Sequence, residues 1–262
     1  MSTLNLDKLF KPKSVAVIGA SNRPGSVGFL TMRNLLEGGF DGPIMPVNPN
    51  RPSVSGVLTY PSVDALPQAP DCAIICTPPQ AVPGVIKDLG EKGTRAAIVL
   101  TAGLSGIKKD DGTTLQQEMQ QIAESYGLRI LGPNCIGLLV PGIGLNASFS
   151  HLNALPGKIA FVSQSGALCT AVLDWARTHD IGFSHFISMG DATDADFGDV
   201  IDYLGSDPST RAILLYIESI KERRNFMSAA RAAARNKPLL AIKSGRVAEG
   251  AAAAASHTGA LA

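Results

Sequence analysis

Short, nearly continuous apolar runs alternate with segments of helical spacing along this chain, and this alternation most constrains its fold. The first run, Ser14–Ala20, ends in glycine and is typical of a buried strand, and Val27–Glu37 has the spacing of a helix. Further strands are predicted at Ile44–Asn48, Asp71–Thr77, Ala96–Thr101 and Arg129–Leu131, and further helices at Val82–Lys92 and Thr114–Tyr126. Because parallel strands need crossover helices and are buried on both faces, the pattern predicts a parallel α/β sheet.

The same alternation starts again after a segment rich in Gly, Pro and Asn, residues 132–157, which we expect to be a loop. Strands are predicted at Lys158–Ser163, Phe183–Met189, Arg211–Glu218 and Pro238–Lys243, and helices at Ala167–His179, Asp199–Gly205 and Glu222–Asn236. Two successive β-α-β series predict two doubly wound domains, residues 1–131 and 132–262, with ligands at the carboxyl ends of the strands. The length of 262 residues agrees with two domains.

Composition excludes several classes of protein. A chain that is 45% hydrophobic and 17% charged is not an extended disordered protein. The 23 basic and 22 acidic residues leave a net charge of +1, so the sequence offers no basic footprint for nucleic acid or for an anionic membrane. No apolar run approaches the ~20 residues of a membrane span, and the N-terminus lacks the apolar core of a signal peptide.

The cysteines indicate a reducing compartment. Cys72, Cys76, Cys135 and Cys169 form no CxxC pair. Cys72 and Cys76 share a predicted strand, where about 13 Å would separate them, too far for a disulfide. We therefore expect reduced thiols in a cytoplasmic protein.

A glycine-rich loop, residues 19–28 (GASNRPGSVG), joins the first predicted strand to the first helix, where backbone N–H groups can hold a phosphate. It is not a GxGxxG motif, because Ser21 replaces the second glycine. The second strand ends near Asn48 and Arg51 rather than at the acid that would bind the ribose of NAD. This pattern favours a nucleotide with an extra ribose phosphate, and both NADP and coenzyme A qualify. The alternative is a tight turn without a ligand.

Two further loops follow predicted strands of the first domain. In the first, Pro78 and Pro79 make a rigid apolar corner that serves either a ligand or only a turn. In the second, residues 132–137 (GPNCIG), Cys135 is a candidate nucleophile, but no histidine lies near it in the sequence. We favour a binding loop that uses Asn134 and backbone amides.

The second domain contains three more candidates. Ser163–Gly166 (SQSG) lacks the flanking glycines of a hydrolase elbow, so it either binds an anion at a helix N-terminus or caps that helix. The acid-rich segment Gly190–Asp199 lacks the ligand spacing of an EF-hand; we interpret it as helix capping and predict no metal site, with a magnesium–phosphate role as the minor alternative. By composition alone, His257 is a surface residue in an alanine-rich tail.

Taken together, these motifs carry a family resemblance. The series GAS…PGSVG, VNPNRP, CTPP, GPNCIG, FVSQSGAL, LLYIES and SHTGALA, in this order, covers essentially the whole chain. It resembles the NDP-forming acyl-CoA synthetase superfamily, of which the succinyl-CoA synthetase α subunit is a member. The motif sequences of the first domain are most similar to those of a bacterial subgroup. In that subgroup an acetate–CoA-ligase-like region is fused to a GNAT protein lysine acetyltransferase.

The resemblance implies a Rossmann-like CoA-binding domain followed by a flavodoxin-like domain. It implies CoA contacts from Gly19, Ser21, Asn22, Arg23, Gly25, Asn48, Arg51, Thr77, Pro78, Pro79 and Asn134. It implies that Ser163, Gln164, Ser165 and Gly166 hold a phosphoryl group. His257 matches the histidine that carries phosphate from an acyl phosphate to ADP, and Glu218 matches the carboxylate that orients it. An imidazole whose second nitrogen faces a carboxylate is suited to this role.

The resemblance also implies partners. An ATP-grasp domain or subunit would hold ATP or ADP with Mg²⁺, and the full-length protein would be an oligomer. The chain stops at Ala262, five residues after His257, so we expect it to be part of a longer protein and inactive alone. The alternative function is a CoA- or acetyl-CoA-sensing region that regulates a fused GNAT domain. A NAD(P) dehydrogenase is disfavoured by the broken glycine motif.

Overall fold

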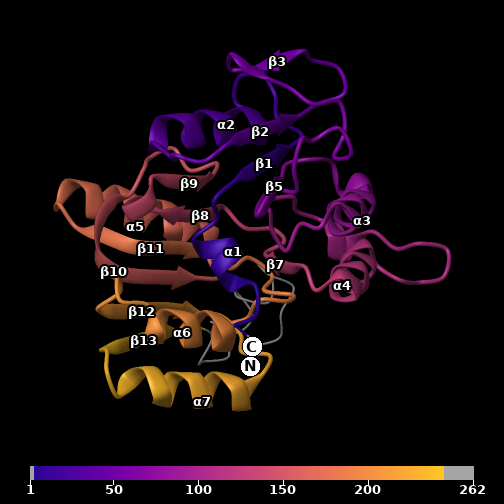
Figure 1. The fold of residues 1–262 in the computed structure, drawn as a ribbon. Coiled ribbons are helices and arrows are strands. Elements are labelled where there is room, and N and C mark those ends of the chain that lie inside the picture. Colours follow the sequence, from indigo (N-terminus) through magenta and orange to yellow (C-terminus); the bar gives the residue numbers. More distant parts are fainter. Residues whose placement is uncertain (1–2, 245–262) are drawn as a thin grey trace.

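Two β-sheets that follow one another along the chain organise the described residues, 3–244 (Figure 1). Residues 1–2 and 245–262 lie outside the described part of this computed structural model. Among the described residues the first sheet is wholly parallel, in the order β2-β1-β5-β6-β7. Its strands are β1 (Val15–Ile18), β2 (Ile44–Val47), β5 (Cys72–Ile75), β6 (Ala96–Val99) and β7 (Arg129–Leu131). Because the chain moves from β1 first to one side and then to the other, the topological switch point lies between β1 and β5.

The second sheet is mixed. Within residues 3–244 its order is β13-β12-β10-β11-β8-β9, and the pairs of β8 with β9 and with β11 are antiparallel. Its strands are β8 (Gly137–Val140), β9 (Leu145–Ser148), β10 (Leu155–Ser163), β11 (Gly182–Ser188), β12 (Ala212–Ile217) and β13 (Leu239–Lys243). The predicted loop over residues 132–157 is therefore wrong. Four-residue strands around the 3-10 turn η3 (Pro141–Ile143) are too short to give an apolar pattern among so many glycines.

Helices cover both faces of each sheet. In the first unit, α2 (Val27–Gly38) lies on one face, and α3 (Val82–Lys92) and α4 (Leu115–Tyr126) lie on the other (Figure 1). In the second unit, α5 (Gly166–Thr178) lies opposite α6 (Phe197–Ser206) and α7 (Arg223–Ala234). The predicted α/β class is confirmed. The predicted domain boundary falls between β7 and β8 and remains a prediction.

One core cluster spans both units. Alternate side chains of the first sheet, such as Val17 and Ile74, share this cluster with Val162 and Leu215 of the second sheet. The short helix α1 (Leu6–Phe10), which the sequence pattern did not predict, adds Leu6, Leu9 and Phe10, and all three are fully buried. The two sheets therefore share a continuous core.

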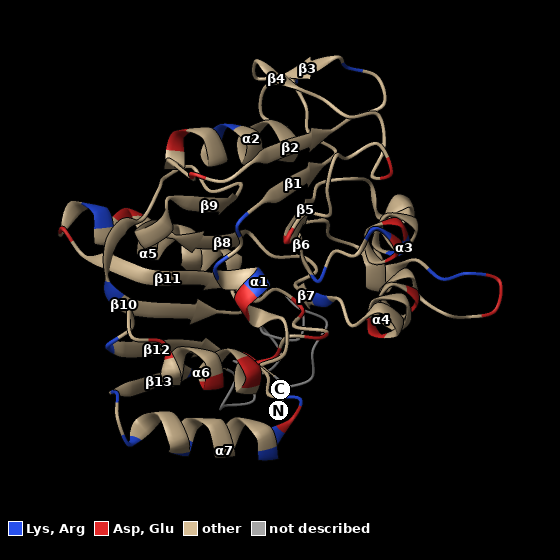
Figure 2. Ribbon diagram, viewed as in Figure 1, with Lys and Arg blue, Asp and Glu red and all other residues tan. Residues whose placement is uncertain are grey.

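Most predicted elements recur within three residues of their expected ends, and α3 and β7 have the predicted bounds. The remaining described elements are the hairpin of β3 (Ser53–Val54) and β4 (Val57–Leu58) and the 3-10 turns η1 (Pro79–Ala81) and η2 (Leu104–Gly106). Basic and acidic residues are interspersed over the outer helices (Figure 2). Every helix in residues 3–244 is too short or too polar to serve as a membrane span.

Candidate functional site

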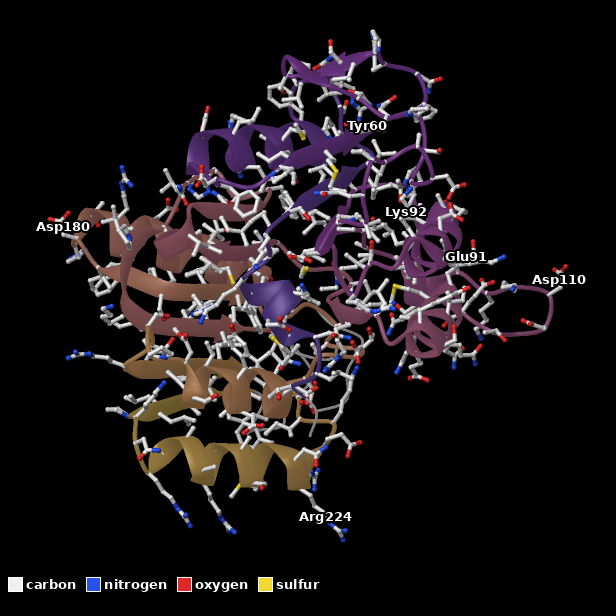
Figure 3. All side chains as sticks on the ribbon, in the orientation of Figure 1. Tyr60, Glu91, Lys92, Asp110, Asp180 and Arg224 are labelled. Carbon is white, nitrogen blue, oxygen red and sulfur yellow. The ribbon has the colours of Figure 1, made fainter. Side chains whose placement is uncertain are left out.

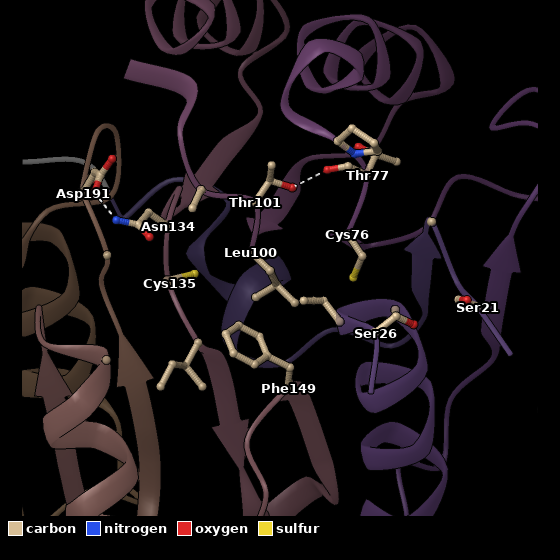
Figure 4. A pocket seen from close by; sticks show the side chains of 18 of the residues that line it. Ser21, Ser26, Cys76, Thr77, Leu100, Thr101, Asn134, Cys135, Phe149 and Asp191 are labelled. Atoms are coloured by element: carbon tan, nitrogen blue, oxygen red, sulfur yellow. Dashed lines mark hydrogen bonds between the residues drawn. The ribbon is translucent and has the colours of Figure 1, made fainter. Parts of the chain in front are cut away.

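A cavity of about 1070 Å³ lies where the carboxyl ends of the two sheets face each other (Figure 4). Its wall includes residues that follow strands β1, β2, β5, β6 and β7 of the first sheet and strands β9, β10, β11 and β12 of the second. A ligand pocket for a small molecule commonly has a volume of about 300–1,000 Å³, so this cavity can hold a large cofactor. The position agrees with the rule that α/β sheets bind ligands beyond their carboxyl ends.

The first end of the cavity is the glycine-rich loop before α2. Gly19 has φ +86°, and a Cβ atom on Gly28 would lie 2.1 Å from the carbonyl oxygen of Gly19. The helix therefore starts in direct contact with the end of β1, which only a glycine at position 28 allows. The hydroxyl of Ser26 accepts a hydrogen bond from the N–H of Phe29 and caps α2. Other N–H groups of this first turn point beyond the start of the helix, where an anion can bind.

Asparagine side chains hold this loop in shape. The amide of Asn48 donates to the carbonyl of Ala20 at 2.7 Å, and its oxygen accepts from the N–H of Asn50 at 2.8 Å. Asn22 donates to the carbonyl of Ser53 and accepts from the N–H of Ser55, so its side chain is directed to the β3–β4 hairpin. Asn48 lines the cavity and Asn22 does not.

The middle of the cavity is formed by loops that bond to one another. The hydroxyl of Thr101 donates to the carbonyl of Thr77 at 2.7 Å, and the amide of Asn134 donates to the carboxylate of Asp191 at 3.1 Å (Figure 4). Burial raises the pKa of Asp191, against the opposing effects of Asn134 and of Lys221. The loops after β7 and β11, one from each sheet, are thus tied together beside the cavity.

The second end of the cavity is the N-terminus of α5. The hydroxyl of Ser165 accepts from the N–H of Leu168 at 3.3 Å, so the predicted helix cap is present. Ser163 is fully buried, and its hydroxyl accepts from the N–H of Ser165 at 3.0 Å and shapes the turn from within. The other N–H groups of the first turn, beginning with that of Gly166, point along the helix axis past its N-terminal end, where an anion can bind.

Gln164 ties this helix start to the end of β12. Its side-chain oxygen accepts from the N–H groups of Glu218 and Ser219, at 2.7 and 2.9 Å. Glu218 is 8% exposed and lines the same cavity as Ser165 and Gly166 at the start of α5. His257, its predicted partner, lies outside the described residues.

Most of the predicted binding residues lie around this one cavity. Those that line it are Gly19, Ser21, Arg23, Asn48, Thr77, Pro78, Asn134, Gln164, Ser165, Gly166 and Glu218. Those that do not are Asn22, Gly25, Arg51, Pro79 and Ser163. Gly25 and Arg51 are exposed loop residues, and Pro79 begins η1 behind Pro78. Their roles in binding remain predictions.

Sequence reasoning missed part of the wall. Leu100, Ile136, Phe149, Ala167 and Thr170 also line the cavity, and none was singled out. Leu100 follows β6 directly, so the rule about carboxyl strand ends would have found it. Phe149 follows β9, a strand that was not predicted.

The structure gives the surroundings of two further candidates from the sequence, Cys135 and the acid-rich segment. Cys135 is 3% exposed, and burial raises the pKa of its thiol far above the usual value, so a thiolate nucleophile is disfavoured. In the acid-rich segment, Asp196 caps α6, while Asp194 and Asp199 form ion pairs with Arg129 of β7 at 3.0 and 2.8 Å. These carboxylates serve capping and contact between the units.

Two family models together match most of the chain. A CoA binding domain matches residues 13–141, and a succinyl-CoA ligase like flavodoxin domain matches residues 156–262. The α subunit of ADP-forming acetate–CoA ligase I from Pyrococcus furiosus is 41% identical over 99% of this chain. The chain belongs to the NDP-forming acyl-CoA synthetase superfamily.

Other members of this superfamily are also similar to the chain over nearly its whole length. ADP-forming acetate–CoA ligase I from Archaeoglobus fulgidus is 42% identical over 98% of the chain. A structure of dinucleotide-forming acetyl-coenzyme A synthetase 1 from Ca. Korarchaeum cryptofilum, in complex with phosphate and ADP, superposes with a TM-score of 0.92 at 40% identity over 99% of the chain. The chain spans 57% of the length of the Pyrococcus subunit, 37% of the Archaeoglobus protein and 56% of the Korarchaeum chain. None of these matches supports the alternative of a fused GNAT acetyltransferase.

Proposed function

We propose that this chain is the CoA-binding and phosphohistidine-bearing part of an ADP-forming acyl-CoA ligase of the acetate–CoA ligase type. The observation that carries the proposal is one cavity with a helix N-terminus at each end and Glu218 on its wall. The N-terminus of α2 would bind the diphosphate of CoA, with Arg23 beside it, and the pantetheine arm would follow Thr77 and Pro78 toward α5. The N-terminus of α5 would bind phosphate.

We propose the following reaction for this site. Phosphate held at Ser165–Gly166 attacks the thioester carbonyl of an acyl-CoA; the C–S bond breaks, a C–O bond forms, and CoA leaves as the thiol. His257 then attacks the phosphorus of the acyl phosphate and releases the carboxylate. The carboxylate of Glu218 keeps the second imidazole nitrogen protonated and stabilises the positive charge that develops on the ring. Transfer of the phosphoryl group to ADP gives ATP, and every step is reversible.

Transfer of the phosphoryl group to ADP requires a further domain or subunit that binds the nucleotide. We propose that an ATP-grasp domain or subunit holds ADP and Mg²⁺, because the relatives named above are longer than this chain. The phosphohistidine would then move between this chain and the partner, within an oligomeric full-length protein.

The proposal is tested first by calorimetric titration with CoA, NAD and NADP. We expect binding of CoA and none of the dinucleotides, because no acid follows β2 to hold a ribose. Binding of NADP without CoA would overturn the proposal.

The phosphoryl step is tested with acetyl phosphate labelled at phosphorus. We expect an acid-labile protein phosphate that His257→Asn abolishes and Glu218→Gln diminishes. His151→Asn is the matched control, because His151 is an exposed histidine paired with Asp174 away from the cavity. Labelling that survives His257→Asn would contradict the assignment.

A further inference from the structure

One part of the cavity wall is apolar and adjoins the phosphate end. A Cβ atom on Gly166 would lie 3.3 Å from Cγ1 and 3.4 Å from Cδ1 of Ile136, so this side chain packs beside the first residue of α5. The N–H of Phe149 donates to the carbonyl of Ile136 at 3.2 Å, which extends the β8–β9 ladder by one cross-strand pair. Side chains of such a pair lie on the same face. Figure 4 shows Phe149 beside Leu100 in the middle of the cavity.

Among the described residues, no Lys or Arg side chain lines this apolar part of the cavity wall. The charged residues that line the cavity in residues 3–244 are Arg23, Asp191 and Glu218. Arg23 belongs to the glycine-rich loop at the opposite end, and the other two are acids. An acyl group with a carboxylate at its far end would therefore meet no positively charged side chain of residues 3–244 there, and burial of an unpaired charge is strongly unfavourable.

We infer that Ile136, Phe149 and Ala167 are the specificity-determining residues for the acyl group and select short, uncharged acyl chains. The inference rests on the proposed function, which places the reacting phosphate at the N-terminus of α5. The acyl carbon is bonded to sulfur before the reaction and to phosphate oxygen after it, so the acyl chain stays in one place beside that phosphate. Ile136 and Ala167 are the apolar residues next to this position, and Phe149 limits the length of the chain.

The test is calorimetric titration of the chain with CoA and with acetyl-, butyryl-, hexanoyl- and succinyl-CoA. Dividing each dissociation constant by that of CoA isolates the acyl contribution. Succinyl-CoA should bind at least about tenfold more weakly than butyryl-CoA, which has the same number of acyl carbons and no charge. In Phe149→Ala, the affinity for hexanoyl-CoA relative to that for acetyl-CoA should increase by about fourfold for each methylene that enters the new space.

A second variant acts in the opposite direction. Ala167 is exposed in the cavity on the first turn of α5, so Ala167→Leu fills the acyl space without disturbing the core. It should weaken the binding of butyryl- and hexanoyl-CoA relative to the binding of CoA by the same variant. Trp175→Ala removes a 56% exposed side chain from the same helix, away from the cavity, and should alter none of these ratios.

The outcomes separate the two proposals. If the wild-type chain does not bind CoA, the proposed function fails, and the inference that rests on it fails too. If CoA binds but the acyl ratios are equal in the wild type and in both variants, the inference alone is overturned. Succinyl-CoA binding as tight as butyryl-CoA binding likewise refutes the selection of uncharged acyl groups.

Discussion

At the scale of single residues, the tightest constraint in the site is the contact between Gly28 and Gly19. We predict that Gly28→Ala weakens CoA binding at least about tenfold and destabilises the fold, because its Cβ would lie 2.1 Å from the Gly19 carbonyl oxygen and push α2 off the end of β1. Titration calorimetry and denaturant unfolding measure the two effects.

The matched control is Gly84→Ala. Gly84 is exposed in α3, and a Cβ there meets nothing within 4 Å. Because alanine is the better helix former, this variant should be more stable by about 0.5–1 kcal/mol and should bind CoA normally. Equal effects of the two substitutions would refute the role given to Gly28.

A buried histidine makes the stability of the fold depend on pH. His185 is fully buried on β11. Burial, with smaller effects of Lys11 and Lys237 and against the opposing effect of Asp207, lowers its pKa to about 4. Its unfolded pKa is ~6.5, so the unfolded chain binds more protons in the window between these values. The contribution of His185 to the free energy of unfolding is then fully present above about pH 6.5 and is lost progressively as the pH falls toward 4.

The expected size of this effect is about 2 kcal/mol of unfolding free energy between pH 7 and pH 5. His185→Leu should remove most of this dependence, whereas His151→Asn, at an exposed histidine, should retain it. Denaturant unfolding at the two pH values measures the difference. A wild-type chain that is equally stable at both would contradict the prediction.

Sequence reasoning found the polar site residues more readily than the apolar ones. Ser165 and Asn48 follow strands whose apolar pattern is clear, so their place at the carboxyl edge could be predicted. Ile136 and Phe149 look like any core residues, and only the pairing of β8 with β9 brings them to the cavity. Whether the polar residues bind CoA is still a prediction.

At the scale of elements, the same difference appears. The C-terminal end of α3 could be predicted because Gly93, with a positive φ of 101°, stops the helix. The pair β8 and β9 could not, because four-residue strands stabilised by a distant helix carry little local signal. The amide of Asn34 on α2 donates to the carbonyls of Ser148 and Ser150 at 2.9 and 2.8 Å, so the first unit holds the end of this hairpin.

This contact gives a prediction about α2 and β9. Asn34→Ala leaves two buried carbonyls without their donor, and we expect a loss of about 2–4 kcal/mol of stability. Phe149, which follows β9 directly, should become more mobile, and the preference among acyl-CoAs should weaken while CoA still binds. Hydrogen exchange of the β9 amides measures the loosening. Unchanged protection there would show that α2 does not hold the hairpin.

At the scale of the whole molecule, the shared core argues that the two sheets fold together. Phe10 of α1 is fully buried and contacts the rings of His185 and Tyr203 in the second unit, with centroids 5.7 and 4.7 Å away. The salt bridge of Lys11 with Asp207 at 2.8 Å extends the same contact. The N-terminal segment thus ties the second sheet to a core that begins on the first.

We therefore predict one cooperative thermal transition for the chain, with the calorimetric enthalpy equal to the van't Hoff enthalpy. Phe10→Ala should lower the stability by about 3–5 kcal/mol and move the whole transition, because the cavity it leaves belongs to both units. Leu58→Ala, at a 69% exposed position on β4, should leave the transition in place. Two separate transitions in the wild type, with Phe10→Ala shifting only one, would show instead that each sheet unfolds independently. In that case the walls of the cavity could move apart without unfolding either unit.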